Sequence, residues 1–334
     1  MIDGDVPGTA VSVAEPEQVV DEKNEEESGQ DSFELDEIEL SDRESEDIDV
    51  NHRRIKRISK LETIPNAKAL CLRNNLIKLI ENLDPLADKL VDLDLYDNQI
   101  TKIQNLEVLR VLQVLDLSYN RIKTIENLGA LKSLTKLYLV NNKISKIENL
   151  SGLPNLTMLE LGANKIRKLE NLDSFPNLEE LFVGNNKISK LEGLENLPKL
   201  KILSIQNNRI TKLEGLQNLV NLEELYISFN GISKIEGLDN LVNLQTLELA
   251  RNRISRIENI SHLSKLEEFW FNDNLVAEWD QLNILVPMKH LKTLYLERNP
   301  IYYAPDTAYR RKILLLLPWL RQLDATLTGV GLRT

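Results

Sequence analysis

Residues able to carry catalytic or metal chemistry are few in this sequence and form no known motif. Asp92 and Asp94 have the spacing of an acid/base pair, while Cys71 is the single cysteine, so neither an intramolecular disulfide nor a cysteine–histidine zinc site is expected. The sequence contains no G-x-x-x-x-G-K-[ST] loop, no G-x-S-x-G elbow and no H-E-x-x-H motif. We therefore expect a non-catalytic protein that uses neither a metal nor a cofactor.

A repeat of 22 residues accounts for most of the chain. The pattern L-x-x-L-x-L-x-x-N-x-I-x-x-I-E-x-L-x-x-L returns after 23 residues, then eight times after 22, then after 25. A register held this long predicts stacked units that share one core rather than separate domains. The repeat asparagines are Asn75, Asn98, Asn120, Asn142, Asn164, Asn186, Asn208, Asn230, Asn252, Asn274 and Asn299.

Each unit has the composition of a short strand followed by a turn and a connector. In Leu137-x-Leu139 the two leucines are expected to point into the core and their neighbours outward. The asparagine tolerates a turn conformation and can bond main-chain groups, and the three-residue apolar spacing after it favours 3-10 turns. The predicted fold is α/β: a leucine-rich solenoid of 22-residue units with parallel strands on its concave face and 3-10 turns on its convex face.

The two ends differ from the regular units. Residues 45–66 are predicted to form an N-terminal capping repeat with Ile48 and Val50 in its strand, and residues 67–300 to form eleven repeats. Residues 301–334 leave the register and are predicted to form a C-terminal cap with a helix around residues 306–316. Its apolar residues are expected to cover the last repeat: Ile313, Leu316, Leu317, Trp319 and Leu320.

Charge is distributed unevenly along the chain. The first 50 residues hold 19 acids and two bases, whereas the remainder has a net charge of +6. Residues 1–44 are therefore predicted to be an acidic disordered tail. Two roles are open for it: a solvating tail, or an electrostatic arm that rests on the basic body or tunes partner choice, adjusted by phosphorylation at Ser28 or Ser41.

Composition also excludes some partners. The acidic excess argues against nucleic-acid binding, which needs net cationic contact with phosphates. The N-terminal sequence has no basic region followed by an apolar core, and no run approaches 18 apolar residues. We therefore expect a soluble intracellular protein that binds no membrane.

Two outward-facing columns carry the unusual residues of the predicted strands. The central column lies between the strand leucines and the second lies two residues earlier, and together they hold eight acids and one base. Rings interleaved with carboxylates are typical of a surface that binds a basic protein partner with apolar pockets, although mutual stacking of the rings is a second interpretation. Five of the 17 aromatic residues are in the central column (Tyr138, Phe182, Tyr226, Trp270, Tyr295), and three more stand just before the turn asparagine (Tyr96, Tyr119, Phe229).

Basic residues and glutamates alternate along one edge of the predicted solenoid. Bases follow the turn asparagine directly and again three residues later, and a glutamate column follows two residues beyond. This alternation indicates a solvated, mutually neutralising face, and a docking strip for an acidic partner or for the chain's own tail is the alternative. The bases directly after the asparagine are Arg121, Lys143, Lys165, Lys187, Arg209 and Arg253.

The repeat N-x-I-x-x-I-E-x-L, the acidic N-terminal segment and the closing P-W-L-R-Q-L-D resemble the leucine-rich-repeat regulatory subunits of type-1 protein phosphatase, the protein phosphatase 1 regulatory subunit 7 family. The resemblance covers about residues 45–330. It implies a mainly nuclear, non-catalytic protein with roles in mitosis that binds the phosphatase catalytic subunit through its concave face. The family's binding positions match Asp116, Tyr138, Glu160, Phe182, Glu268, Trp270 and Tyr295, and the column pattern adds Tyr226 and Glu248 as partner-binding candidates.

Two functional hypotheses follow. The first is a regulatory subunit that modulates the activity, maturation or localisation of the catalytic subunit of type-1 Ser/Thr protein phosphatase, in the nucleus and also the cytoplasm, with room for a third regulatory protein. The chain contains no basic-Val/Ile-x-Phe/Trp docking peptide, so binding is expected to come from the folded surface. The alternative is a leucine-rich-repeat scaffold of a ribonucleoprotein or cytoskeletal assembly.

Overall fold

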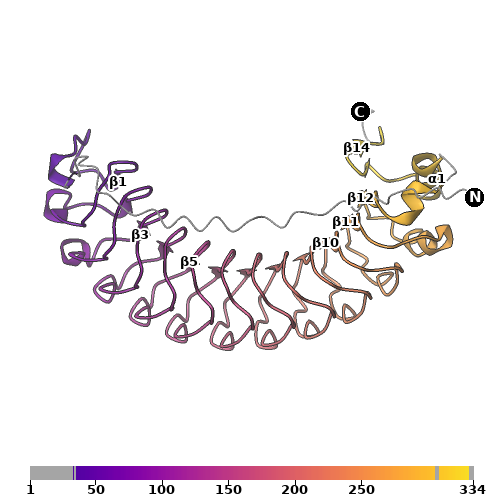
Figure 1. Ribbon diagram of the computed structural model, residues 1–334, viewed down its shortest axis with the longest axis horizontal. Coiled ribbons are helices and arrows are strands. Elements are labelled where there is room, and N and C mark those ends of the chain that lie inside the picture. Colours follow the sequence, from indigo (N-terminus) through magenta and orange to yellow (C-terminus); the bar gives the residue numbers. More distant parts are fainter. Residues whose placement is uncertain (1–32, 34, 305–307, 331–334) are drawn as a thin grey trace, which may run out of the picture. The chain divides into compact units, whose positions relative to one another are not determined.

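The repeats form a continuous stack of coils. The computed structural model describes residue 33, residues 35–304 and residues 308–330. Within this part each coil contributes one short strand to a single sheet of 14 strands, in which the strand order follows the chain order. The strands line the inner side of the curved stack and the connectors its outer side (Figure 1). The predicted solenoid fold is confirmed.

Strands β1 to β13 pair in parallel, and only the last pair, β13 with β14, is antiparallel. Neighbouring strands pair without slippage between corresponding repeat positions, so that Asp116 lies opposite Tyr138 and Tyr138 opposite Glu160. The strands are β1 (Asp47–Asp49), β2 (Ala69–Cys71), β3 (Asp92–Asp94), β4 (Val114–Asp116), β5 (Lys136–Tyr138), β6 (Met158–Glu160), β7 (Glu180–Phe182), β8 (Ile202–Ser204), β9 (Glu224–Tyr226), β10 (Thr246–Glu248), β11 (Glu268–Trp270), β12 (Thr293–Tyr295), β13 (Gln322–Leu323) and β14 (Thr326–Leu327).

The convex connectors are built from 3-10-type bonds, as predicted. In a middle repeat the Leu131 N–H donates to the Leu128 carbonyl at 3.0 Å and the Leu134 N–H to the Leu131 carbonyl at 3.1 Å. Longer 3-10 segments occur toward the ends of the stack, together with one α-helix. These are η1 (Leu35–Glu37), η2 (Leu61–Thr63), η3 (Asp84–Leu86), η4 (Trp279–Leu285), η5 (Pro300–Tyr303) and α1 (Tyr309–Leu316).

The repeat leucines and isoleucines form one core that runs the length of the stack. In the coil that contains β5, the side chains of Leu137, Leu139, Ile144, Ile147 and Leu150 are at most 1% exposed. Because the strand alternates its side chains, burying Leu137 and Leu139 turns Lys136 and Tyr138 outward. The core therefore determines which residues reach the concave face.

The repeat asparagines are buried and connect successive coils. The Asn164 Nδ2 donates to the carbonyls of Leu139 (2.8 Å) and Leu161 (3.1 Å), while its Oδ1 accepts the Ile144 N–H at 3.0 Å. The expected main-chain bonding by asparagine is therefore present. The turn conformation is different from the expectation, because the positive φ is on the preceding residue, such as Ala163 (φ 53°). The asparagine must aim inward to reach these carbonyls, so the chain reverses one residue earlier.

The N-terminal boundary of the ordered body differs from the prediction of a disordered tail through residue 44. Leu35 and Ile38 are 2% and 6% exposed and pack on the core, and the Arg43 guanidinium donates to Thr63 Oγ1 at 3.0 Å and to the Ile38 carbonyl at 2.8 Å. The prediction is wrong for residues 35–44, because two apolar residues three apart can cover the first coil despite their acidic neighbours. Residues 1–32 and 34, including Ser28, lie outside the described residues, whereas Ser41 is exposed.

The C-terminal segment closes the other end of the core. Ile313, Leu317 and Leu320 are fully buried, and Leu316 and Trp319 pack against them from partly buried positions. Asp324 Oδ1 accepts the main-chain N–H groups of Leu296 and Glu297 at 2.8 and 2.9 Å, and its other oxygen accepts the Tyr309 hydroxyl at 3.1 Å. Residues 305–307 and 331–334 of the predicted cap lie outside the described residues.

Candidate functional site

The nine residues predicted to bind a partner lie in register on neighbouring strands. Eight of them belong to the central column, and the ninth, Glu268, lies two residues before Trp270 on β11. All nine are half-buried: the backbone and their column neighbours cover part of each side chain and the rest faces outward. The column runs through β4 to β12 without a break as Asp116, Tyr138, Glu160, Phe182, Ser204, Tyr226, Glu248, Trp270 and Tyr295.

The N-terminal half of the two columns is a cluster of carboxylates. Burial raises the pKa of Asp92, and the neighbouring carboxylate of Asp116 raises it further. Burial, followed by Asp116, also raises the pKa of Glu160. The pKa of the Tyr138 hydroxyl is raised by burial and then by Glu160. The cluster thus concentrates negative charge that water only partly screens, which favours a cationic partner group.

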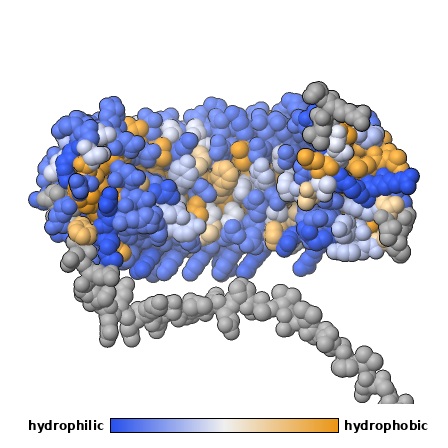
Figure 2. Space-filling view, turned by 90° about the horizontal axis from the view of Figure 1, so that it is seen from above, coloured by the Kyte–Doolittle hydropathy of each residue, from blue (hydrophilic) through white to orange (hydrophobic). Residues whose placement is uncertain are grey.

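Most column carboxylates have no basic partner of their own. Of the eight acids in the two columns, only Asp94 is within ion-pair distance of a base among the described residues, at 3.5 Å from Arg73. The face seen from above is largely hydrophilic with separate apolar patches (Figure 2). The remaining seven carboxylates are therefore available to groups brought by another molecule.

The C-terminal half of the columns holds its aromatic rings in fixed positions. Trp270 stacks on Tyr295 with ring centroids 4.0 Å apart and planes 8° from parallel, and its indole N–H donates to Glu268 at 3.2 Å. The Tyr295 hydroxyl accepts a bond from Gln322 Nε2 at 2.7 Å. The exposed face of the Trp270–Tyr295 pair and the Glu268 carboxylate are therefore held in position before any partner binds.

Tyr226 is held in the same way. Its hydroxyl donates to Glu224 Oε2 at 2.6 Å, and the pKa of this hydroxyl is raised by burial and then by that bond. The alternative interpretation, in which the rings stack on one another, is correct for Trp270 and Tyr295. Among the described residues no ring contact joins Tyr138, Phe182 or Tyr226 to another ring. Mutual stacking therefore explains only part of the aromatic column.

The alternating bases and glutamates of the edge pair with one another. Lys146 is 3.6 Å from Glu148, and Lys190 lies between Glu192 at 3.7 Å and Glu214 at 4.0 Å. These pairs support the interpretation of a mutually neutralising face. The bases directly after the repeat asparagine behave differently, because Arg121, Lys143 and their equivalents have no carboxylate at ion-pair distance in the described part of the chain.

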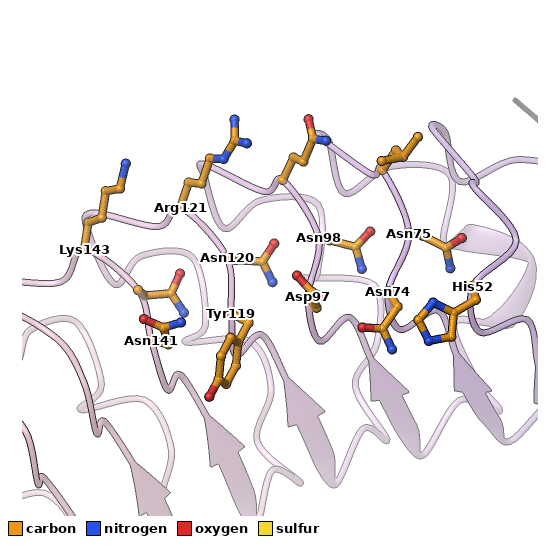
Figure 3. Close-up of a pocket in the computed structure, with 13 residues that line it drawn as sticks. His52, Asn74, Asn75, Asp97, Asn98, Tyr119, Asn120, Arg121, Asn141 and Lys143 are labelled. Carbon is orange, nitrogen blue, oxygen red and sulfur yellow. The ribbon is translucent and has the colours of Figure 1, made fainter. Parts of the chain in front are cut away.

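A shallow cavity of about 540 Å³ lies beside the first repeat asparagines. His52, Asn74 and Tyr119 line it together with Arg121 and Lys143, whose side chains point away from the strand ends (Figure 3). From the sequence, Tyr119 was distinguished only as a ring just before the turn asparagine. A sharper signal was available, because most repeats place Asn or Asp at its position and this one places a bulky ring.

Among the described residues, no three His, Cys, Asp or Glu side chains are grouped so that they could hold a metal ion. Burial raises the pKa of the Cys71 thiol to about 11, which keeps it protonated and unreactive near neutral pH. In that same part of the chain, no helix has the length and apolar character needed to cross a bilayer.

Comparisons with known proteins agree with the architecture. The family described as "Leucine Rich repeats (2 copies)" matches residues 88–130, 110–152, 132–174, 176–218, 198–240, 220–265 and 242–284, which together make up more than half of the chain. A solved structure of an internalin from Listeria monocytogenes superposes with a TM-score of 0.66 at 27% identity, covering 83% of this chain and 86% of that one.

Shorter stretches are similar to phosphatase regulatory proteins. A stretch of 54 residues is 55% identical to protein phosphatase 1 regulatory subunit 7 of Xenopus tropicalis, covering 16% of this chain and 15% of that protein. Another of 60 residues is 47% identical to protein phosphatase 1 regulatory subunit pprA of Dictyostelium discoideum, covering 18% and 17%. Each match therefore spans less than a fifth of the relative's length.

Proposed function

Because this chain belongs to the leucine-rich-repeat family and contains stretches similar to regulatory subunits of protein phosphatase 1, we propose that it is a non-catalytic regulatory subunit of that phosphatase. It binds the catalytic subunit of the type-1 Ser/Thr enzyme through the two concave columns and modulates its activity, maturation or localisation. The proposal includes a nuclear and cytoplasmic location and a complex that can include a third regulatory protein.

The observation that carries the proposal is the pairing of unneutralised carboxylates with prearranged rings on one open face. Seven column carboxylates without a base attract a cationic surface, and complementary charge speeds encounter and selects the partner. The raised pKa of Glu160, caused first by burial, shows that its charge is costly in the free protein. A Lys or Arg of the catalytic subunit would relieve that cost.

Trp270 is the strongest anchor on this face. Its stacking on Tyr295 and its bond to Glu268 restrict the ring before binding, so little side-chain entropy remains to be lost. Tryptophan in such a prearranged position is typical of binding hot spots. A buried apolar pocket of the catalytic subunit would cover the outer ring face and leave the indole bond to Glu268 in place.

The test is the affinity of purified catalytic subunit for the full chain, measured by calorimetry for wild type and for Trp270→Ala combined with Glu268→Ala. We expect the dissociation constant to rise about 30-fold or more, because a hot spot contributes about 2 kcal/mol or more. Tyr303→Ala is the matched control, since this ring is 67% exposed and lies on η5 outside the columns. It should leave the affinity unchanged.

Circular dichroism and the thermal midpoint establish that the double variant remains folded. Undiminished capture by that folded variant would refute binding through the columns. Copurification of RNA or tubulin with the intact chain, without the phosphatase, would refute the regulatory function and support the scaffold alternative instead.

A further inference from the structure

The residue before each repeat asparagine adopts a left-handed backbone conformation. In all of these turns but the last, its N–H donates to a carbonyl of the next coil, as from Tyr119 to Val140 at 2.7 Å and from Phe229 to Ala250 at 3.0 Å. We call these eleven positions the turn row: Asn74, Asp97, Tyr119, Asn141, Ala163, Asn185, Asn207, Phe229, Arg251, Asp273 and Arg298.

Two members of the turn row are bulky aromatic residues in a conformation that they disfavour. Tyr119 has φ 56° and Phe229 φ 53°, where Asn and Asp are tolerated and a large side chain is an outlier. Neither ring is used by the core, since Tyr119 is 42% and Phe229 48% exposed. Each ring therefore combines backbone strain with exposed apolar surface. Strain of this kind is characteristic of functional positions.

Both rings are supported from one side by residues of neighbouring coils. The Tyr119 ring is 4.7 Å from the Tyr96 ring, over which the Arg73 guanidinium lies at 4.2 Å. The Arg251 guanidinium lies 4.6 Å from the centre of the Phe229 ring. These contacts restrict both rings at the edge of the sheet. A partner that binds them therefore removes less side-chain conformational entropy.

The charge beside the turn row is positive. The row of bases that begins with Arg121 and Lys143 follows six of the repeat asparagines, whereas the coil of Phe229 has Gly231 at this position. These bases are exposed apart from the half-buried Lys187, and none has an ion-pair partner among the residues that the structure describes. Arg121 and Lys143 line the same cavity as Tyr119, although their side chains extend away from its ring (Figure 3). A surface complementary to this edge must offer carboxylates around apolar pockets.

We propose that Tyr119 and Phe229 are two anchors of a second contact line with the same phosphatase catalytic subunit. This inference rests on the proposed function and extends it from the concave columns to the turn row. The two rings are five coils apart, which is about 24 Å at the spacing of neighbouring strands. One folded domain that occupies the concave face could span that separation. Acidic residues and apolar pockets at the border of this domain would then contact the turn row. The strain is retained because the rings bind.

The experiment compares Tyr119→Asn and Phe229→Asn with wild type, using calorimetric affinity for purified catalytic subunit and the thermal midpoint. Each variant should weaken binding about tenfold or more, because an aromatic anchor is removed. Its thermal midpoint should stay the same or rise, because Asn suits the left-handed turn better than a ring does. A contact that merely stabilised the fold could not produce both results.

Ala163→Asn is the matched control, since it makes the same backbone change in the same row without removing a ring. Its affinity should stay within about twofold of wild type while its midpoint rises. Equal binding by wild type and both ring variants would overturn this inference and leave the columns as the binding site. Weaker binding together with a lower midpoint would assign the rings to stability and also overturn it. If wild type itself does not bind the catalytic subunit, the proposed function fails and this inference with it.

Discussion

Replacing one buried repeat asparagine tests how the coils are held together. In Asn164→Ala the Ile144 N–H loses its acceptor, the Asn164 Oδ1 at 3.0 Å, and no other acceptor reaches it in the structure. The carbonyls that Asn164 contacts are less affected. Leu139 keeps a bond from Asn142 at 3.2 Å, and Leu161 keeps one from Asn186 at 3.0 Å.

The expected cost therefore comes mainly from one orphaned N–H. An unsatisfied buried donor costs about 1–3 kcal/mol, so Asn164→Ala should lower the free energy of unfolding by about 2 kcal/mol. The loss should be local, because each coil contacts only its neighbours. Hydrogen exchange of the Ile144 amide should accelerate about 30-fold, at about tenfold per 1.4 kcal/mol, while the Ile254 amide, bonded to Asn274 at 3.0 Å, should not change.

The matched control is Asn155→Ala. Asn155 is exposed and makes one hydrogen bond, from its Nδ2 to the Lys132 carbonyl at 2.9 Å, so its loss should cost less than about 0.5 kcal/mol. Urea unfolding gives the stability of both variants, and exchange measured by mass spectrometry or NMR locates the effect. Equal stability of the two variants, or unaltered hydrogen exchange of the Ile144 amide, would show that the buried asparagines do not contribute the expected stability.

Two further predictions concern the turn glycines and the acidic column. Gly193→Ala should lower the free energy of unfolding in urea by about 1–3 kcal/mol, because φ at this position is +70° and the new Cβ would lie 2.8 Å from the Leu169 carbonyl oxygen. The control Gly129→Ala should not destabilise the protein, since its Cβ would meet nothing within 4 Å. Equal losses in the two variants would contradict the role given to the backbone conformation of Gly193. Glu160→Gln should be more stable than wild type at pH 7, because burial and Asp116 raise the pKa of Glu160 in the folded chain. The folded state then binds the proton more tightly than the unfolded state. Wild type therefore gains stability as the pH falls toward 4.5, the ordinary pKa of a glutamate. The stability difference between the two chains should shrink over that range, and a constant difference would rule out the titration of Glu160 as its cause.

Much of the fold could be predicted from periodicity because the chain is nearly one-dimensional. A fixed spacing of 22 residues assigns every position to the core, the sheet face or the connector, and alternation then predicts that Tyr138 and Trp270 point outward. The observed register confirms this placement. Whether these residues bind a partner stays a prediction, since periodicity determines which side chains share a column and says nothing of what covers them.

The tertiary structure decided what side chains in neighbouring coils do to one another. The stacking of Trp270 on Tyr295, the reach of Asn164 into the coil before it, and the left-handed turn one residue before each asparagine all depend on rotamers and backbone angles. The packing of Leu35 onto the first coil was hidden by its acidic surroundings. A repeat sequence by itself thus determines the rows along the solenoid. Only the folded chain determines which members of a row are strained, stacked or left without a partner. Hydrogen bonds and ring contacts between coils join residues 20 or more positions apart, and they depend on the geometry of both coils.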